Sequence, residues 1–164
     1  MVLPTGNAMS DAGGRWASSE SDRAIRTWRS LFRGEARVKK DIEITDADIA
    51  ASNLILWGDP SSNAILARIL AKLPLEWTPT RLAIGKETCN AQGCMPVMIY
   101  PNPLNPDRYI VLNSGPTFRE DSNGTNSLQT PRLPDAALID LSEPPGVTRP
   151  GKVVWAGFFN ESWR

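Results

Sequence analysis

The stretch LILWGDPSSNAILARIL, residues 54–70, holds an apolar run, a polar turn and a helical pattern in succession. An apolar run stops at Gly58, polar turn-forming residues follow, and apolar side chains then recur at helical spacing: Ile65, Leu66, Ile69, Leu70 and Leu73. A short apolar run of this kind is typical of a buried strand, and the later spacing is typical of an amphipathic helix. Pro74 ends the pattern, because proline cannot continue a helix. We therefore predict a strand over 53–57, a tight turn and a helix.

Outward from this unit, helical patterns concentrate in the first half of the chain and strand patterns in the second. Alternation at Val38, Ile42 and Ile44 predicts a strand over 36–44, and short apolar runs predict five more, at 81–85, 96–100, 109–113, 136–141 and 152–159. The order predicts a three-layer α/β domain with a mixed sheet. Its start should be partly parallel, Rossmann- or flavodoxin-like, and its later strands antiparallel because their connections are too short for crossover helices.

The N-terminal residues show little periodicity. Residues 1–18 are rich in Gly, Ala and Ser and read as a partly ordered linker, which leaves 19–164 as a single α/β domain. Ser19 and Asp22 predict a helix start, and one helical face then collects Ile25, Trp28, Leu31 and Phe32. The first residues lack the pattern of a signal peptide, so we expect a segment of a longer protein.

Two further segments stand out between the predicted elements. Thr45 and Asp48 form a capping-box pattern, which predicts a short helix ending near Ser52. The connection 119–135 is long for a compact domain, so we expect it to be mobile or functional.

Composition excludes several kinds of function. The 164 residues hold 18 basic and 18 acidic side chains, so no net charge draws the chain to nucleic acid or to an anionic membrane. The chain contains no histidine, which removes Ser-His-Asp and Cys-His nucleophilic sites and every zinc site that uses histidine. Two cysteines cannot form a Cys₄ site. We therefore expect no metal, no cofactor and no membrane insertion.

The turn after the first predicted strand is a candidate ligand site. Its polar side chains follow the carboxyl end of a strand, where open α/β sheets bind ligands: Asp59, Ser61, Ser62 and Asn63. The stretch matches neither a phosphate-binding loop nor the nucleophile motif G-x-S-x-G. The alternative is that Asp59 closes the turn while Ser61 or Ser62 caps the helix.

A second turn has the same form. The run YIVLN, residues 109–113, leads into polar and small residues, and the candidate ligand-binding side chains here are Asn113, Ser114, Gly115 and Arg119. If this strand runs parallel to 53–57, both turns open at one edge of the sheet and form a single crevice. The alternative is an Asn-Ser-Gly turn beside an ordinary surface arginine.

Other candidate features remain open between two explanations. The proline-rich connection 101–108 suits either contact with another domain or simple linkage, and its candidate interface residues are Tyr100, Asn102, Asn105 and Arg108. Cys89 and Cys94 could form a local disulfide or remain two thiols. Six tryptophans favour a core or an interface over a platform for sugars, and we expect Trp28, Trp57 and Trp155 in the core.

The turn GDPSSN (58–63) and the run YPNPLNPDRYIVLNSG (100–115) are the most specific pieces of a resemblance that covers nearly the whole chain. The sequence resembles the C-terminal accessory domain of secreted bacterial hydrolases of planctomycete type, whose catalytic part is an α/β hydrolase similar to prolyl oligopeptidase or acetyl-xylan esterase. In such parents the nucleophile, the histidine and the acid lie upstream. The resemblance therefore implies a domain without its own catalytic residues, and export of the parent favours a disulfide between Cys89 and Cys94.

Taken together, the sequence predicts a non-catalytic accessory domain of a secreted or periplasmic hydrolase. Its expected partner is the upstream α/β-hydrolase catalytic domain, and it would pack on that module or bind a ligand beside it. An accessory domain should expose an apolar patch near the 101–108 connection or near the first residues of the chain. The alternatives are a small-ligand-binding or weakly catalytic domain that uses the crevice, and a carbohydrate-binding module that uses coplanar exposed tryptophans.

Overall fold

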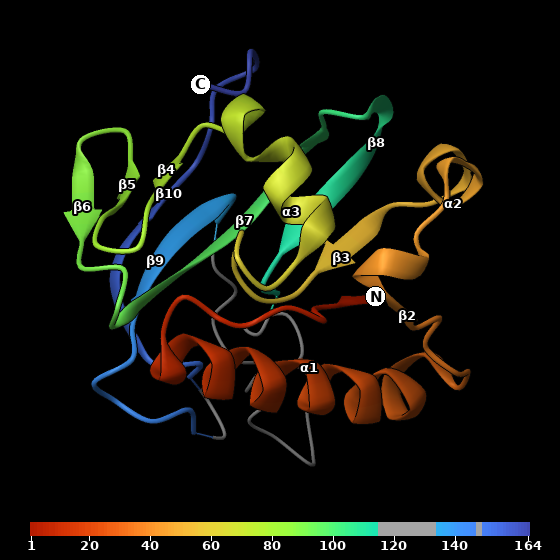
Figure 1. Cartoon of the computed structure of the whole chain (residues 1–164), viewed down its shortest axis with the longest axis horizontal. Helices are drawn as coiled ribbons and strands as arrows, with labels where there is room; N and C mark the ends of the chain where they lie inside the picture. The colour runs from red at the N-terminus through yellow and green to blue at the C-terminus, as the bar shows by residue number, and fades with distance from the viewer. Residues whose placement is uncertain (115–133, 147–148) are drawn as a thin grey trace.

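A computed structural model of the chain describes residues 1–114, 134–146 and 149–164, without the side chains of Ser30 and Leu31 (Figure 1). The strands are β1 (Val2–Leu3), β2 (Lys39–Lys40), β3 (Leu54–Leu56), β4 (Glu76–Trp77), β5 (Leu82–Ile84), β6 (Glu87–Cys89), β7 (Cys94–Asn102), β8 (Asn105–Leu112), β9 (Ala136–Asp140) and β10 (Lys152–Gly157). The helices are α1 (Asp11–Phe32), α2 (Asp46–Ala51) and α3 (Ala64–Ile69), with short 3₁₀ turns η1 (Asp41–Glu43) and η2 (Leu70–Lys72).

The main sheet has seven strands in the order β10-β9-β7-β8-β3-β1-β2, and β4, β5 and β6 form a separate antiparallel sheet. The pairs β1–β2, β1–β3 and β3–β8 are parallel, whereas β7 pairs antiparallel with β8 and β9, and β9 with β10. The predicted α/β class with a mixed, partly parallel sheet is confirmed. The order β2-β1-β3 is that of a flavodoxin-like start, which places the carboxyl ends of β1 and β3 on one edge and their amino ends on the other.

Alternation along β3 explains the layers. Leu54 and Leu56 belong to the large core that includes the buried face of α3, whereas Ile55 and the following Trp57 pack with Ala24 and Trp28 of α1. Successive side chains of a strand point to opposite faces, so α1 and α3 lie on opposite sides of the sheet. The strand at 53–57 and the helix after it are therefore present as the opening stretch predicts, with α3 burying Ile65, Leu66 and Ile69.

The predicted linker over 1–18 is wrong. Residues 2–3 form β1 inside the main sheet, and α1 begins at Asp11, where the Ser10 side chain accepts a hydrogen bond from the Gly13 N–H (3.0 Å). Small residues weaken the hydrophobic signal of a helix, yet they permit close packing: a Cβ on Gly13 would lie 3.1 Å from the Met95 sulfur. Gly, Ala and Ser here allow close contact with the sheet.

The predicted face of α1 is correct only in part: Trp28 packs with Ala24 and Trp57 and Ile25 is half-buried, whereas the side chain of Leu31 lies outside the described residues. The buried side is Trp16, Ala17, Glu20, Ser21 and Ala24, while Phe32 at the end of the helix is 62% exposed. The earlier start of the helix brings this different stripe against the sheet.

The predicted strand over 36–44 is reduced to the two residues of β2. Ile42, expected to face the core, is 71% exposed, and the neighbouring Asp41 is buried instead. The Asp41 carboxylate Oδ2 accepts a hydrogen bond from the Ala64 N–H at the start of α3 (2.7 Å), which the local alternation could not reveal. The short helix predicted from Thr45 and Asp48 is confirmed as α2, with both bonds of the capping box.

Candidate functional site

The two predicted turns meet at the carboxyl ends of β3 and β8. The Asn113 Oδ1 accepts a hydrogen bond from the Gly58 N–H (2.9 Å), and its Nδ2 donates to the Gly58 carbonyl (3.0 Å) and to the Pro96 carbonyl (3.3 Å). Asn113 is fully buried and has a left-handed backbone (φ 51), a conformation that asparagine tolerates better than most residues. The predicted convergence of the two turns is confirmed by these bonds.

Asp59 closes its turn with three backbone donors. Its Oδ1 accepts from the N–H groups of Ser61 and Ser62 (both 2.9 Å), and its Oδ2 accepts from the Met9 N–H (2.9 Å). The Ser62 hydroxyl accepts in turn from the Asp59 N–H (2.9 Å). Met9 follows β1, so this buried carboxylate joins the loop after β1 to the loop after β3.

The backbones of these two loops also touch. The Ser62 carbonyl accepts from the N–H groups of Thr5 (3.1 Å) and Gly6 (2.8 Å), and a Cβ on Gly6 would lie 2.6 Å from the Ser61 carbonyl oxygen. Only glycine fits so close an approach. Flavodoxin-like sheets bind ligands between the loops that follow β1 and β3. In this chain, backbone hydrogen bonds join these two loops directly.

The cap of α3 is Asn63, not Ser61 or Ser62 as predicted. The Asn63 Oδ1 accepts from the N–H groups of Ile65 (3.1 Å) and Leu66 (3.2 Å), and its Nδ2 donates to the Trp57 carbonyl (2.9 Å). The two serines belong to the turn that Asp59 organises, which moves the helix start to the next residue.

Ser114 differs from the other buried residues of the crevice. Its hydroxyl is buried and has no hydrogen-bond partner among the residues that the structure describes. Gly115 and Arg119, predicted to complete the site, lie outside the described residues, as does most of the 119–135 connection. Asp59, Asn63 and Asn113 thus serve the turn itself, and ligand binding here stays a prediction.

The predicted interface residues contact their own chain. The Asn105 Nδ2 donates to the Ile49 carbonyl (3.1 Å) and the Arg108 Nε to the Ala50 carbonyl (3.3 Å), so both hold the end of α2. The Asn102 Oδ1 accepts from the Leu104 N–H (3.0 Å) within the β7–β8 hairpin. The Tyr100 ring packs edge-on against Phe159 and Trp163.

Cys89 on β6 and Cys94 on β7 are free thiols in the structure, hydrogen-bonded to one another. Burial raises the pKa of both thiols. The sequence leaves open a disulfide or two thiols, and the structure has two thiols.

None of the six tryptophans is exposed. Trp16, Trp57 and Trp77 are buried, and Trp28, Trp155 and Trp163 are half-buried. Trp57 is in the core as predicted, while Trp28 and Trp155 lie at its margin. A sugar platform needs an exposed pair, and the tryptophans, all within the described residues, do not supply one.

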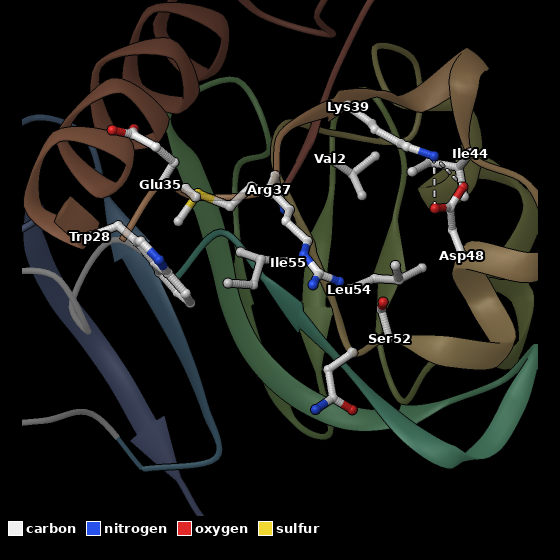
Figure 2. Close-up of a pocket in the computed structure, with 13 residues that line it drawn as sticks. Val2, Trp28, Glu35, Arg37, Lys39, Ile44, Asp48, Ser52, Leu54 and Ile55 are labelled. Carbon is white, nitrogen blue, oxygen red and sulfur yellow. Dashed lines mark hydrogen bonds and ion pairs between the residues drawn. The ribbon is translucent and has the colours of Figure 1, made fainter. Parts of the chain in front are cut away.

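No sequence motif indicates a hollow at the opposite end of the strands. A cavity of about 320 Å³ opens at the amino ends of β1 and β3, next to the edge strand β2 (Figure 2). Its apolar lining comes from Met1, Val2, Trp28, Ala36, Ile44, Leu54 and Ile55, and its polar lining from Glu35, Arg37, Lys39, Asp48, Ser52 and Asn53. These residues follow no motif, and only the fold brings them together.

Most charges around the hollow are paired. The Lys39 Nζ lies 2.7 Å from the Asp48 carboxylate, and the Arg29 guanidinium lies 2.9 Å from that of Glu35. The bond from Lys39, with bonds from Thr45, lowers the pKa of Asp48 well below its usual value. Arg37 forms no ion pair with any residue that the structure describes, and Figure 2 shows its side chain extending into the hollow.

Within residues 1–114, 134–146 and 149–164, no three His, Cys, Asp or Glu side chains lie close enough together to hold a metal ion. None of the helices described there is long and apolar enough to cross a membrane. Comparison with protein-family models, with curated proteins and with solved structures finds no match to this chain.

Proposed function

We propose that this chain is a non-catalytic accessory domain of a secreted or periplasmic hydrolase, and that it docks on the α/β-hydrolase catalytic module. The observation that carries the proposal is an apolar surface beside the first residues of the chain. We call it the β2-edge surface and define it by Trp28, Phe32, Val38, Ile42 and the hollow that Trp28 helps to line.

The β2-edge surface is open to a partner. Phe32, Val38 and Ile42 are 62%, 39% and 71% exposed, and the Phe32 ring lies 4.5 Å from that of Trp28. β2 ends the main sheet, so its outer backbone groups face no further strand of the described sheet. Trp28 lines the hollow itself, and Val38 and Ile42 precede and follow its lining residue Lys39 in the chain. Exposed apolar side chains close to a hollow are typical of protein–protein contact surfaces.

The polar turns support a domain without catalysis of its own. Three backbone N–H groups already donate to the Asp59 carboxylate, and the Asn113 amide is bonded on both its oxygen and its nitrogen. A hydrolytic site in a chain without histidine would need a carboxylate base or a Ser–Lys pair. Asp59, the acid of the first turn, acts instead as a structural acceptor.

A binding experiment tests the docking. The catalytic module of a secreted α/β hydrolase that carries such a domain would be immobilised, and the whole chain would be passed over it in biolayer interferometry. We expect Phe32→Ser with Ile42→Ser to weaken binding about tenfold or more, because central apolar contacts dominate interface energies.

The chain offers a matched control for this experiment. Phe158→Ser removes a side chain that is 81% exposed beyond β10, at the opposite edge of the main sheet, and should leave binding unchanged. A wild-type chain that fails to bind, or a control variant that weakens binding as much as the β2-edge variants, would overturn the proposal.

The buried hydroxyl of Ser114 favours a second candidate, a small-ligand domain at the carboxyl ends of β3 and β8. A thermal-shift screen with nucleotides, sugars, phosphates and carboxylates tests this candidate. A ligand that raises the melting temperature of the wild type but not of Ser114→Ala would support it. The same shift in both proteins would place the ligand elsewhere.

A further inference from the structure

We infer that the hollow of the β2-edge surface recognises a carboxylate attached to an apolar group, and that Arg37 is the residue that pairs with it. The inference rests on the proposed docking, because we assign the carboxylate to the segment of the hydrolase module that enters the hollow. It goes further by stating which chemistry that segment presents.

The walls of the hollow require an apolar group. Trp28, Leu54 and Ile55 contribute aromatic and branched side chains, and the volume of about 320 Å³ is at the lower end for ligand pockets. One bulky side chain with a neighbouring polar group fits such a space. An entirely polar group would lose its hydration against these walls without compensation.

The polar lining favours a negative charge. Figure 2 shows Arg37 extending from the loop before β2 toward Ile55, Leu54 and Ser52. Glu35 and Asp48, the acids of the lining, are already paired with Arg29 and Lys39. Within the described part of the chain, Arg37 is therefore the one charged side chain of the lining that has no ionic partner. The Met1 ammonium, which also lines the hollow, donates to the Arg37 carbonyl, and burial lowers its pKa, which favours the neutral amine.

A carboxylate matches Arg37 better than other anions do. The planar guanidinium donates two parallel hydrogen bonds to a carboxylate, and the single negative charge balances the one unpaired side-chain cation. A phosphate dianion would leave one charge uncompensated against apolar walls, because the Lys39 ammonium is held by Asp48 and burial favours the neutral form of the Met1 amine. The low polarity of the walls strengthens the attraction relative to water.

A titration followed by NMR tests the recognition directly. The probes are phenylacetate and phenylacetamide, which share a ring and differ in the carboxylate. We expect phenylacetate to shift the Trp28 indole N–H and the backbone amides of Arg37 and Ile55, and phenylacetamide to shift them far less. Arg37→Gln should remove the difference between the probes, whereas Arg26→Gln, an exposed arginine elsewhere on α1, should keep it.

Binding to the immobilised hydrolase module provides the second readout. Arg37→Gln should weaken binding about tenfold, Arg37→Glu should weaken it further, and added salt should reduce the difference between wild type and Arg37→Gln. Arg26→Gln again serves as the control.

The outcomes separate the two ideas. Equal shifts from both probes, or unchanged module binding in Arg37→Glu, would overturn the carboxylate inference even where the module binds the wild type. A wild-type chain that distinguishes the probes but does not bind the module would overturn the docking and support the carboxylate preference of the hollow.

Discussion

The two ends of the parallel strands differ in how their polar groups are used. At the carboxyl ends of β3 and β8, polar residues are dense, but Asp59, Asn63 and Asn113 bond to backbone groups of their own chain. At the amino ends of β1 and β3, polar residues are scattered, yet a hollow remains and Arg37 extends into it. The end with the more suggestive sequence is thus the more tightly closed in the described structure.

This difference teaches that residue type alone does not make a site. A buried amide or carboxylate whose hydrogen bonds are satisfied stabilises the fold, and removing it leaves unpaired backbone groups. A charged side chain that has no ionic partner and lies beside an open apolar hollow can still pair with a ligand or a partner protein. The following predictions test whether the two ends divide in this way.

The largest effect is expected at Asn113. Asn113→Ala leaves the Gly58 N–H and carbonyl without their partner and places alanine at a left-handed backbone position, so we expect a loss of about 2–4 kcal/mol of unfolding free energy. Urea denaturation followed by tryptophan fluorescence measures it. Asn113→Gly relieves the backbone strain but does not restore the hydrogen bonds, so it should destabilise the protein somewhat less than Asn113→Ala does. A loss below about 1 kcal/mol in Asn113→Ala would show that the closed network is not essential.

A smaller loss is expected at Asp59. Asp59→Asn keeps one acceptor oxygen for Ser61 and Ser62 but turns an N–H₂ group toward the Met9 N–H, which should cost about 1–2 kcal/mol in the same urea experiment. Asp22→Asn, on the exposed side of α1, is the matched control and should change little. Equal stability of Asp59→Asn and wild type would indicate that the carboxylate is kept for something other than the turn.

At the open end, the expected effect depends on pH. The bond from Lys39 lowers the folded-state pKa of Asp48, so the ion pair contributes stability above the ordinary carboxyl pKa of about 4 and loses it as the pH falls below that value. The urea midpoint of the wild type should exceed that of Asp48→Asn at pH 7, and the difference should shrink at pH 3. Lys39→Met should reproduce the loss at pH 7. A difference that grows on acidification would contradict this assignment.

The smallest effect on stability is expected at Phe32. Phe32→Ser changes an exposed side chain at the end of α1, so the unfolding free energy should change by less than about 0.5 kcal/mol. Calorimetry of the variant measures the melting temperature. A large destabilisation would mean that Phe32 supports the fold, and that its exposure does not mark a docking surface.

Local patterns predicted the elements whose signal is strong and contiguous. The apolar run at β3, the helical spacing of α3 and the capping box of α2 each specify their element within a few residues. The predicted β7–β8 hairpin also places Asn113 at the far end from residues 102–105. Hydrogen bonds and apolar spacing within one segment suffice for these features.

Other features failed because their cause lies elsewhere in the chain. α1 begins at the local cap Ser10, but its small residues pack against Met95 of β7, and the buried Asp41 carboxylate accepts from the Ala64 N–H. Neither of these distant partners can be read from the residues around α1 or η1.

Short-range patterns were enough to predict the α/β class and the mixed sheet. They predicted that the two turns meet only on the condition that β3 and β8 run parallel, and the pairing of these strands meets that condition. Which polar groups remain free to bind a ligand or a partner follows only from the folded chain. Met9 donates to Asp59 from 50 residues away, and the hollow gathers side chains from α1, the segment before β2, α2 and β3. Whether a side chain stabilises or binds depends on partners that are distant in the chain, and only folding brings these partners within hydrogen-bonding distance.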